Sequence, residues 1–158
     1  MRLHEDKTLF RQAVTATAGL LNIPDIFIEK DYWVTYALHT IFHDQIGGET
    51  VFKGGTALSK CFGLIERFSE DIDLVIKRHE GETDNQLKRK IKQIGQVVTS
   101  KLPEVDIEGL TRKMGMNRKT AHTYPQIFDG RFGQVRNVIV VEARSEERRV
   151  GKECATGC

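Results

Sequence analysis

The stretch VFKGGTALSKCFGLIERFSEDIDLVI, residues 51–76, constrains the fold of this chain more than any other. A short apolar run leads into Gly54 and Gly55, a helix-length segment follows, and the chain returns through DIDLVI. The last run alternates and then becomes wholly apolar, which is typical of a strand that leaves a site and enters a core. Because residues i and i+2 of a strand share a face, Asp71 and Asp73 are predicted to point the same way.

Two carboxylates on neighbouring positions of one strand face suit hard cations. The Cα atoms of Asp71 and Asp73 are expected to lie roughly 6.6 Å apart. Unpaired, the two acids would repel each other and the pKa of one would rise, and a divalent cation removes that penalty. Mg²⁺ prefers one or two carboxylates together with phosphate oxygens and water. We therefore predict that Asp71 and Asp73 bind metal and are catalytic.

The double glycine is predicted to hold phosphate. Gly54 and Gly55 can turn backbone N–H groups toward an anion, and the helix that follows offers its unsatisfied N–H groups. Thr56 adds a hydroxyl, and Lys60, one turn later, can reach the same side. A lone glycine pair or a lone DID is usually structural, but the two together, with a short helix between them, fit nucleotide transfer from a triphosphate.

Three other phosphate or metal motifs are excluded. A P-loop needs G-x-x-x-x-G-K-[ST], and nothing after the glycines fits it. An EF-hand loop would need an oxygen ligand and then glycine where the chain has Val75 and Ile76. His39 and His43 have the spacing of a zinc peptidase, but Thr40 stands where the glutamate is needed. These histidines are predicted to be partly exposed helix residues.

The periodicity of the whole chain predicts an α+β fold, a small mixed β-sheet with helices packed on one side. One or two further strands are expected between 106 and 137, with turns at Asp129–Gly130 and around Gly133. The expected helices cover 6–21, from 25 or 29 to 42, 56–62 and 83–102, and the expected strands cover 51–52, 71–76 and 138–141.

The length of 158 residues predicts one domain. We assign 1–143 to it. After Ala143 the apolar period is lost in RSEERRVGKECATGC, so 144–158 is expected to be a disordered or non-native tail, similar to translated sequencing-library adapter. On that interpretation the chain stops before the rest of its fold.

Composition adds little about partners. A net charge of +2 neither requires nor excludes a nucleic acid, because a local basic patch counts for more than the sum. Three cysteines without framework spacing favour a reducing compartment. With no signal peptide and no membrane-length apolar run, we expect a cytoplasmic protein without membrane association.

Three segments carry a resemblance to a known family: IEKDYWVTYAL, FKGGTALSK and RFSEDIDL. They resemble the AbiEii/AbiGii nucleotidyltransferase toxins of the DNA polymerase β-like nucleotidyltransferase superfamily. The resemblance is clear over 28–76 and weaker from there to 143. It implies a nucleotidyltransferase-like catalytic core and a toxin of a bacterial toxin–antitoxin or abortive-infection pair.

The resemblance also implies an activity and partners. Such a toxin transfers a nucleoside monophosphate from an NTP with Mg²⁺, some relatives modify tRNA acceptor ends, and a cognate antitoxin is encoded next door. The superfamily supplies a third acid from a later strand, for which Glu142 is the candidate. Lys53 and Arg67 either contact phosphate or acceptor or pair with acids. The nucleotide-binding set is Gly54, Gly55, Thr56, Lys60 and Ser69.

Two other functions stay open. The chain could be an inactive fragment or a nucleotide-binding module without transfer activity. It could also be a non-enzymatic domain that binds a partner through a helix face containing Trp33 and Tyr36, although an aromatic stripe of that kind is far more often core.

Overall fold

The structure is a computed structural model, which describes residues 3–62, 71–129 and 136–145. Its α-helices are α1 (Lys7–Leu21), α2 (Asp25–Phe42), α3 (Gly54–Phe62) and α4 (Asp84–Thr99), with 3₁₀ turns η1 (Leu3–Glu5) and η2 (Gln45–Glu49). Its strands are β1 (Thr50–Lys53), β2 (Asp71–Ile76), β3 (Glu104–Val105), β4 (Arg112–Met114), β5 (Asn117–Thr123) and β6 (Val138–Ser145).

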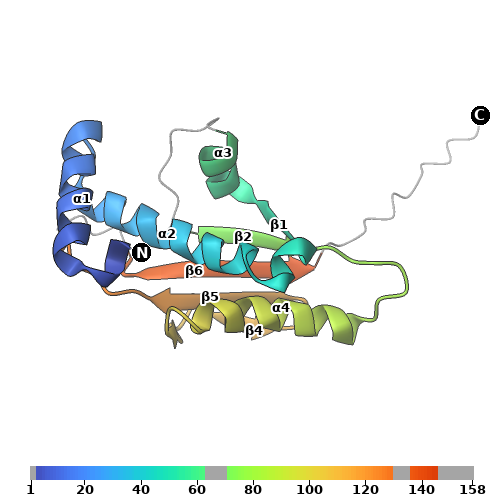
Figure 1. Cartoon of the computed structure of the whole chain (residues 1–158). Coiled ribbons are helices and arrows are strands. Elements are labelled where there is room, and N and C mark those ends of the chain that lie inside the picture. Colours follow the sequence, from blue (N-terminus) through green and yellow to red (C-terminus); the bar gives the residue numbers. More distant parts are fainter. Residues whose placement is uncertain (1–2, 63–70, 130–135, 146–158) are drawn as a thin grey trace, which may run out of the picture.

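The strands form one mixed sheet in the order β1-β2-β6-β5-β3, with β4 paired to β5. Strand β2 runs parallel to β6, and the other pairs are antiparallel. Helices α2 and α4 contact each other and lie over one face of this sheet, whereas α3 follows β1 at the sheet edge (Figure 1). The predicted α+β fold with a mixed sheet is confirmed.

Successive side chains of β2 and β6, two neighbouring strands inside the sheet, point alternately to its two faces. Ile72, Leu74 and Ile76 of β2 are fully buried in the main core with residues of α2 and α4, together with Ile139 and Val141 of β6. The residues between them therefore point to the opposite face. That face carries Asp71, Asp73 and Glu142.

Local signals explain where several helices begin. The Asp6 carboxylate accepts hydrogen bonds from the amides of Thr8 and Leu9 at the start of α1, and Thr83 and Gln86 form a capping box at the start of α4. Helix α3 begins at Gly54, two residues before the predicted start. The glycines thus belong to its first turn instead of a separate loop.

One strand expectation needs correction, and another is confirmed by two strands between 106 and 137. Strand β6 continues to Ser145, so Glu142 lies inside it and not at its end, because β2 and β5 pair with β6 on both sides. Between 106 and 137 the structure has a hairpin of β4 and β5, whose two-residue turn is Gly115–Met116. Gly115 has φ +65°, as a hairpin turn with glycine first requires. The turns expected at Asp129–Gly130 and Gly133 involve 130–135, outside the described residues.

The aromatic face of α2 is core. Trp33 is 1% exposed, and its ring stacks on Tyr124 with centroids 5.7 Å apart. The hypothesis of a partner-binding face built on Trp33 therefore loses its main residue. His39 on α2 and His43, the residue that caps its C-terminus, are both exposed, as predicted.

Glu29 and Lys30 are both fully buried on α2. Their side chains bind the backbone of the segments that precede and follow residues 130–135. The Glu29 carboxylate accepts hydrogen bonds from the backbone N–H groups of Ile127 and Phe128, at 2.7 and 2.9 Å. The Lys30 ammonium donates to the backbone carbonyls of Arg136 and Val138. These bonds join α2 to the segment after β5 and to the start of β6.

Removing the Glu29 carboxylate should strongly destabilise the fold. Glu29→Ala leaves two backbone N–H groups without their acceptor and opens a cavity, which together should lower the free energy of unfolding by about 3 kcal/mol. Urea unfolding at pH 7 measures the loss. Asp31→Ala is the matched control, because Asp31 on the same helix is half exposed and its pair with Lys60 contributes at most about 1 kcal/mol. Equal losses in both variants would contradict the anchoring role of Glu29.

Candidate functional site

Strand pairing places four charged residues in one row across the open face of the sheet. In the register of neighbouring strands, Lys53 of β1 lies opposite Asp73 of β2, Asp73 opposite Glu142 of β6, and Glu142 opposite Lys119 of β5. Asp71 lies on the same face, two residues from Asp73 along β2. The predicted third acid, 69 positions further along the chain than Asp73 (142 − 73), is thus its direct neighbour.

The glycine turn lies against the carboxylate pair. Gly54 has φ +80°, and a Cβ atom built on it would lie 2.2 Å from Oδ2 of Asp73. No side chain fits in that space, so the backbone of Gly54 approaches the carboxylate directly. At Gly55 a Cβ would meet nothing within 4 Å. The two features that the sequence predicts to share a pocket are therefore in contact.

Asp73 lies partly buried beside two other acids. Burial raises the pKa of Asp73 above its usual value, and the nearby carboxylates of Glu142 and Asp71 raise it further. Lys119 and Arg144 act in the opposite direction without cancelling the rise in pKa. The charged form of Asp73 is therefore disfavoured by burial and by its two acidic neighbours.

Two polar residues of β5 contact the acids. The side-chain amide of Asn117 donates to Oε1 of Glu142 at 3.1 Å. The ammonium of Lys119 lies 3.8 Å from Oδ2 of Asp71 and 3.7 Å from Oε2 of Glu142. The acids are thus oriented from β5 as well as from their own strands.

Thr56 and Lys60 are placed differently from each other. Thr56 is 1% exposed, and its hydroxyl donates to the backbone carbonyl of Asp71, which ties α3 to the first residue of β2. The Lys60 ammonium is held by α2, 2.7 Å from Oδ1 of Asp31 and 2.9 Å from the hydroxyl of Thr35. Lys60 is therefore directed to the helix layer in this structure. Ser69 and Arg67 lie outside the described residues.

Comparison with protein families gives a match over residues 36–150, to the family described as Nucleotidyl transferase AbiEii toxin, Type IV TA system. The chain belongs to this family. The family is one of nucleotidyl transferase toxins of toxin–antitoxin systems, which implies an antitoxin as partner. The match extends over the first residues of the predicted tail. A search of curated proteins gives no match.

The oxygen-rich donor set of this AbiEii-family chain fits a divalent cation chemically. Carboxylates are the ligands Mg²⁺ prefers, and a bound cation would favour the charged form of Asp73, which burial and the two nearby acids disfavour. As they stand, the described residues contain no group of three or more His, Cys, Asp or Glu side chains converged on one metal position, and this includes the three site carboxylates. Lys119 lies between two of them instead.

Asn117, Lys119 and Arg144 were missed by sequence reasoning. They belong to NRKTAHT and VIVVEARS, the segments that form β5 and β6, and neither segment by itself shows which strand lies beside which acid. A correct register for β5 and β6 would have revealed them, since it aligns Lys119 with Glu142 and Asn117 with Arg144.

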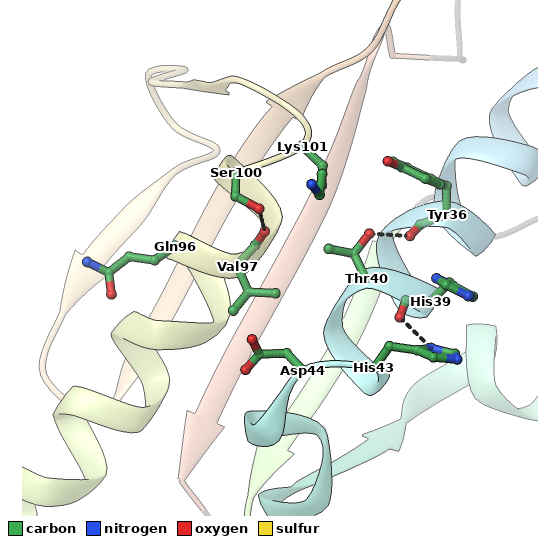
Figure 2. Close-up of a pocket in the computed structure, with 9 residues that line it drawn as sticks. All are labelled: Tyr36, His39, Thr40, His43, Asp44, Gln96, Val97, Ser100 and Lys101. Atoms are coloured by element: carbon green, nitrogen blue, oxygen red, sulfur yellow. Dashed lines mark hydrogen bonds between the residues drawn. The ribbon is translucent and has the colours of Figure 1, made fainter. Parts of the chain in front are cut away.

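A separate pocket of about 440 Å³ lies between α2 and α4, in the helix layer (Figure 2). His39, His43 and Asp44 line one side of it, and Gln96 and Lys101 line the other. The two imidazole rings stack with centroids 3.7 Å apart, and Nδ1 of His43 is 2.9 Å from the backbone carbonyl oxygen of His39. The carboxylates lie on the other face of the sheet, so this pocket is separate from the candidate active site.

No helix in the described part of the chain is both long and apolar enough to cross a membrane.

Proposed function

We propose that this chain transfers a nucleoside monophosphate from an NTP to an acceptor hydroxyl with Mg²⁺, in the cytoplasm. The single observation that carries the proposal is the contact of Gly54 with Asp73, in the strand row that also contains Glu142. A backbone turn that accepts phosphate thereby adjoins carboxylates that accept a cation, and a metal-bound triphosphate needs both.

Each part of the site has one task. The N–H groups of Gly54 and Gly55, at the start of α3, would bind the triphosphate. Thr56 would keep α3 fixed to β2 through the Asp71 carbonyl. Asp71 and Asp73 would hold the metal, with Glu142 beside them. When bound, Mg²⁺ would neutralise phosphate charge and make the α-phosphorus more electrophilic.

The reaction that fits this arrangement is a displacement at phosphorus. The oxygen of the acceptor hydroxyl forms a bond to the α-phosphorus, the bond to the bridging oxygen of the β-phosphate breaks, and pyrophosphate leaves. The hydroxyl proton passes to a carboxylate of the site. We assign this role to Glu142, because Asn117 orients it and its side chain is 28% exposed, within reach of an incoming acceptor.

An RNA acceptor, tRNA among them, is favoured by the charges around the acids. Lys53, Arg112 and Arg144 are exposed, and strand register places them on the same face as the carboxylates. Basic side chains around a transfer site bind the phosphates of a nucleic acid and position it without reading its sequence.

Incubation of the chain with each α-³²P-labelled NTP, Mg²⁺, total RNA and a protein extract tests the proposal. We expect label from one or a few NTPs in RNA of tRNA size, and none when EDTA is present. Label on protein would refute the RNA acceptor while preserving the transfer. If labelled NTP binds but no acceptor becomes labelled, the chain is a nucleotide-binding module or an inactive fragment.

A further inference from the structure

Lys119 lies between two of the three carboxylates of the candidate active site. Its ammonium, on β5, is 3.8 Å from Oδ2 of Asp71 and 3.7 Å from Oε2 of Glu142. Its Cα is paired with that of Glu142, so the side chain crosses from β5 toward the acids of β6 and β2. One positive charge therefore sits between two carboxylates that belong to different strands.

The geometry is that of a loose ion pair. Both distances exceed the 2.7–3.2 Å typical of an N–H···O hydrogen bond. By contrast, the Lys60 ammonium is 2.7 Å from Asp31, and that of Lys113 is 2.6 Å from Asp106. Lys119 is held near the acids by charge without direct hydrogen bonds to them, and a side chain held in this way can leave when a stronger cation arrives.

The Glu142 carboxylate and the backbone of Asp71 are each held by a contact that does not involve Lys119. Oε1 of Glu142 accepts a hydrogen bond from Asn117, which leaves Oε2 to face Lys119. Asp71 begins β2, where Thr56 binds its backbone carbonyl. Arg144 of β6, which like Lys119 lowers the pKa of Asp73, is exposed. Departure of the lysine would thus uncover a Glu142 carboxylate that Asn117 orients and an Asp71 whose backbone is tied to α3.

We propose that Lys119 is the resident counter-cation of this carboxylate site and that a divalent metal ion binds by displacing it. The inference deepens the proposed function and rests on its metal site. Before the metal binds, the positive charge of the lysine reduces the repulsion among the acids without removing it. It also competes with the metal, and so sets the metal concentration at which the site fills.

The test measures metal affinity and stability separately from catalysis. Lys119→Met keeps the length of the side chain and removes its charge. Mn²⁺, followed by electron paramagnetic resonance, replaces Mg²⁺ as the probe. We expect Lys119→Met to bind Mn²⁺ about tenfold more tightly, because a positive charge a few ångströms from the ion is gone. Without metal, its melting temperature should fall by about 2–4 °C.

Two further variants separate this role from general charge effects. Lys92→Met makes the same change in net charge on the exposed side of α4, remote from the acids, and should bind Mn²⁺ as the unmodified chain does. Lys119→Arg keeps the charge and should restore the weaker binding. A lysine that merely braced the acids would give the opposite result, since its loss would weaken Mn²⁺ binding.

The outcomes distinguish this inference from the proposed function. Mn²⁺ affinity in Lys119→Met that equals or falls below that of the unmodified chain overturns the inference, as does the absence of Mn²⁺ binding in every variant. Tighter binding by Lys119→Met in a chain that transfers no nucleotide upholds the inference and refutes only the transfer.

Discussion

Asp73→Asn should lower nucleotide transfer by about 10³-fold or more and at the same time make the protein more stable at neutral pH. The activity falls because an amide oxygen is a much weaker ligand than a carboxylate for the metal that stabilises charge at the phosphorus, an effect worth several kcal/mol. Stability rises because the carboxylate that is lost is unfavourable in the folded state.

The sign of the stability effect follows from the pKa of Asp73. Burial, Glu142 and Asp71 raise it above the ordinary value of 3.8, so the folded state binds this proton more tightly than the unfolded state does. The contribution of Asp73 to stability is therefore complete below pH 3.8 and is lost as the pH rises through the raised pKa. Asparagine does not titrate, so its advantage should appear as the pH rises through that window.

Chemical unfolding of both proteins from pH 3 to pH 7 measures this difference, and the labelled-NTP assay measures transfer. Asp106→Asn is the matched control, since Asp106 is 73% exposed and its pair with Lys113 lies at the surface. That variant should change neither quantity appreciably. If Asp73→Asn transfers nucleotide at the normal rate, the mechanism proposed for this site is wrong.

Gly54→Ala should damage both the fold and the site. The left-handed backbone at Gly54, with φ +80°, costs about 1–2 kcal/mol for a residue with a Cβ. The added methyl group would also overlap Asp73, because its position is 2.2 Å from Oδ2. We expect a loss of about 2–4 kcal/mol in the free energy of unfolding. Displacement of the Asp73 carboxylate should lower transfer by about 10²-fold.

Gly55→Ala is the control for the stability effect. A Cβ at Gly55 meets nothing within 4 Å, and its φ is not in the left-handed region. In the first turn of α3, alanine should therefore leave stability unchanged or raise it by up to about 1 kcal/mol. Urea unfolding of both variants gives the comparison. Equal stabilities would show that the close approach of Gly54 to Asp73 places no constraint on the fold.

The elements of the fold could largely be predicted from local sequence. Helices α1, α2 and α4 follow their apolar periods, and Asp6 and Thr83 mark two of the starts. The two-residue turn at Gly115 was missed, although glycine as the first turn residue was a usable signal. The two-residue strand β3 was also missed, because so short a segment has no period to detect.

The candidate site was predictable only in part. Gly54, Gly55, Asp71 and Asp73 lie within 20 residues of one another (54 to 73), and one short helix between two neighbouring strands brings them together. Lys60 was expected near phosphate, but its ammonium binds Asp31 of α2. A helical position defines the side of α3 on which the lysine lies, and not which neighbouring element its long side chain reaches.

From the sequence alone came the two acids on one strand face and the glycines that precede them, because both depend on backbone geometry over a few residues. The tertiary structure decided that β2 pairs with β6 and β6 with β5, which places Glu142 and Lys119 beside those acids. Pairing between distant strands depends on how the whole sheet buries its apolar face against α2 and α4. A change of register by one residue would turn Glu142 toward the core, and no local pattern around it specifies that alignment.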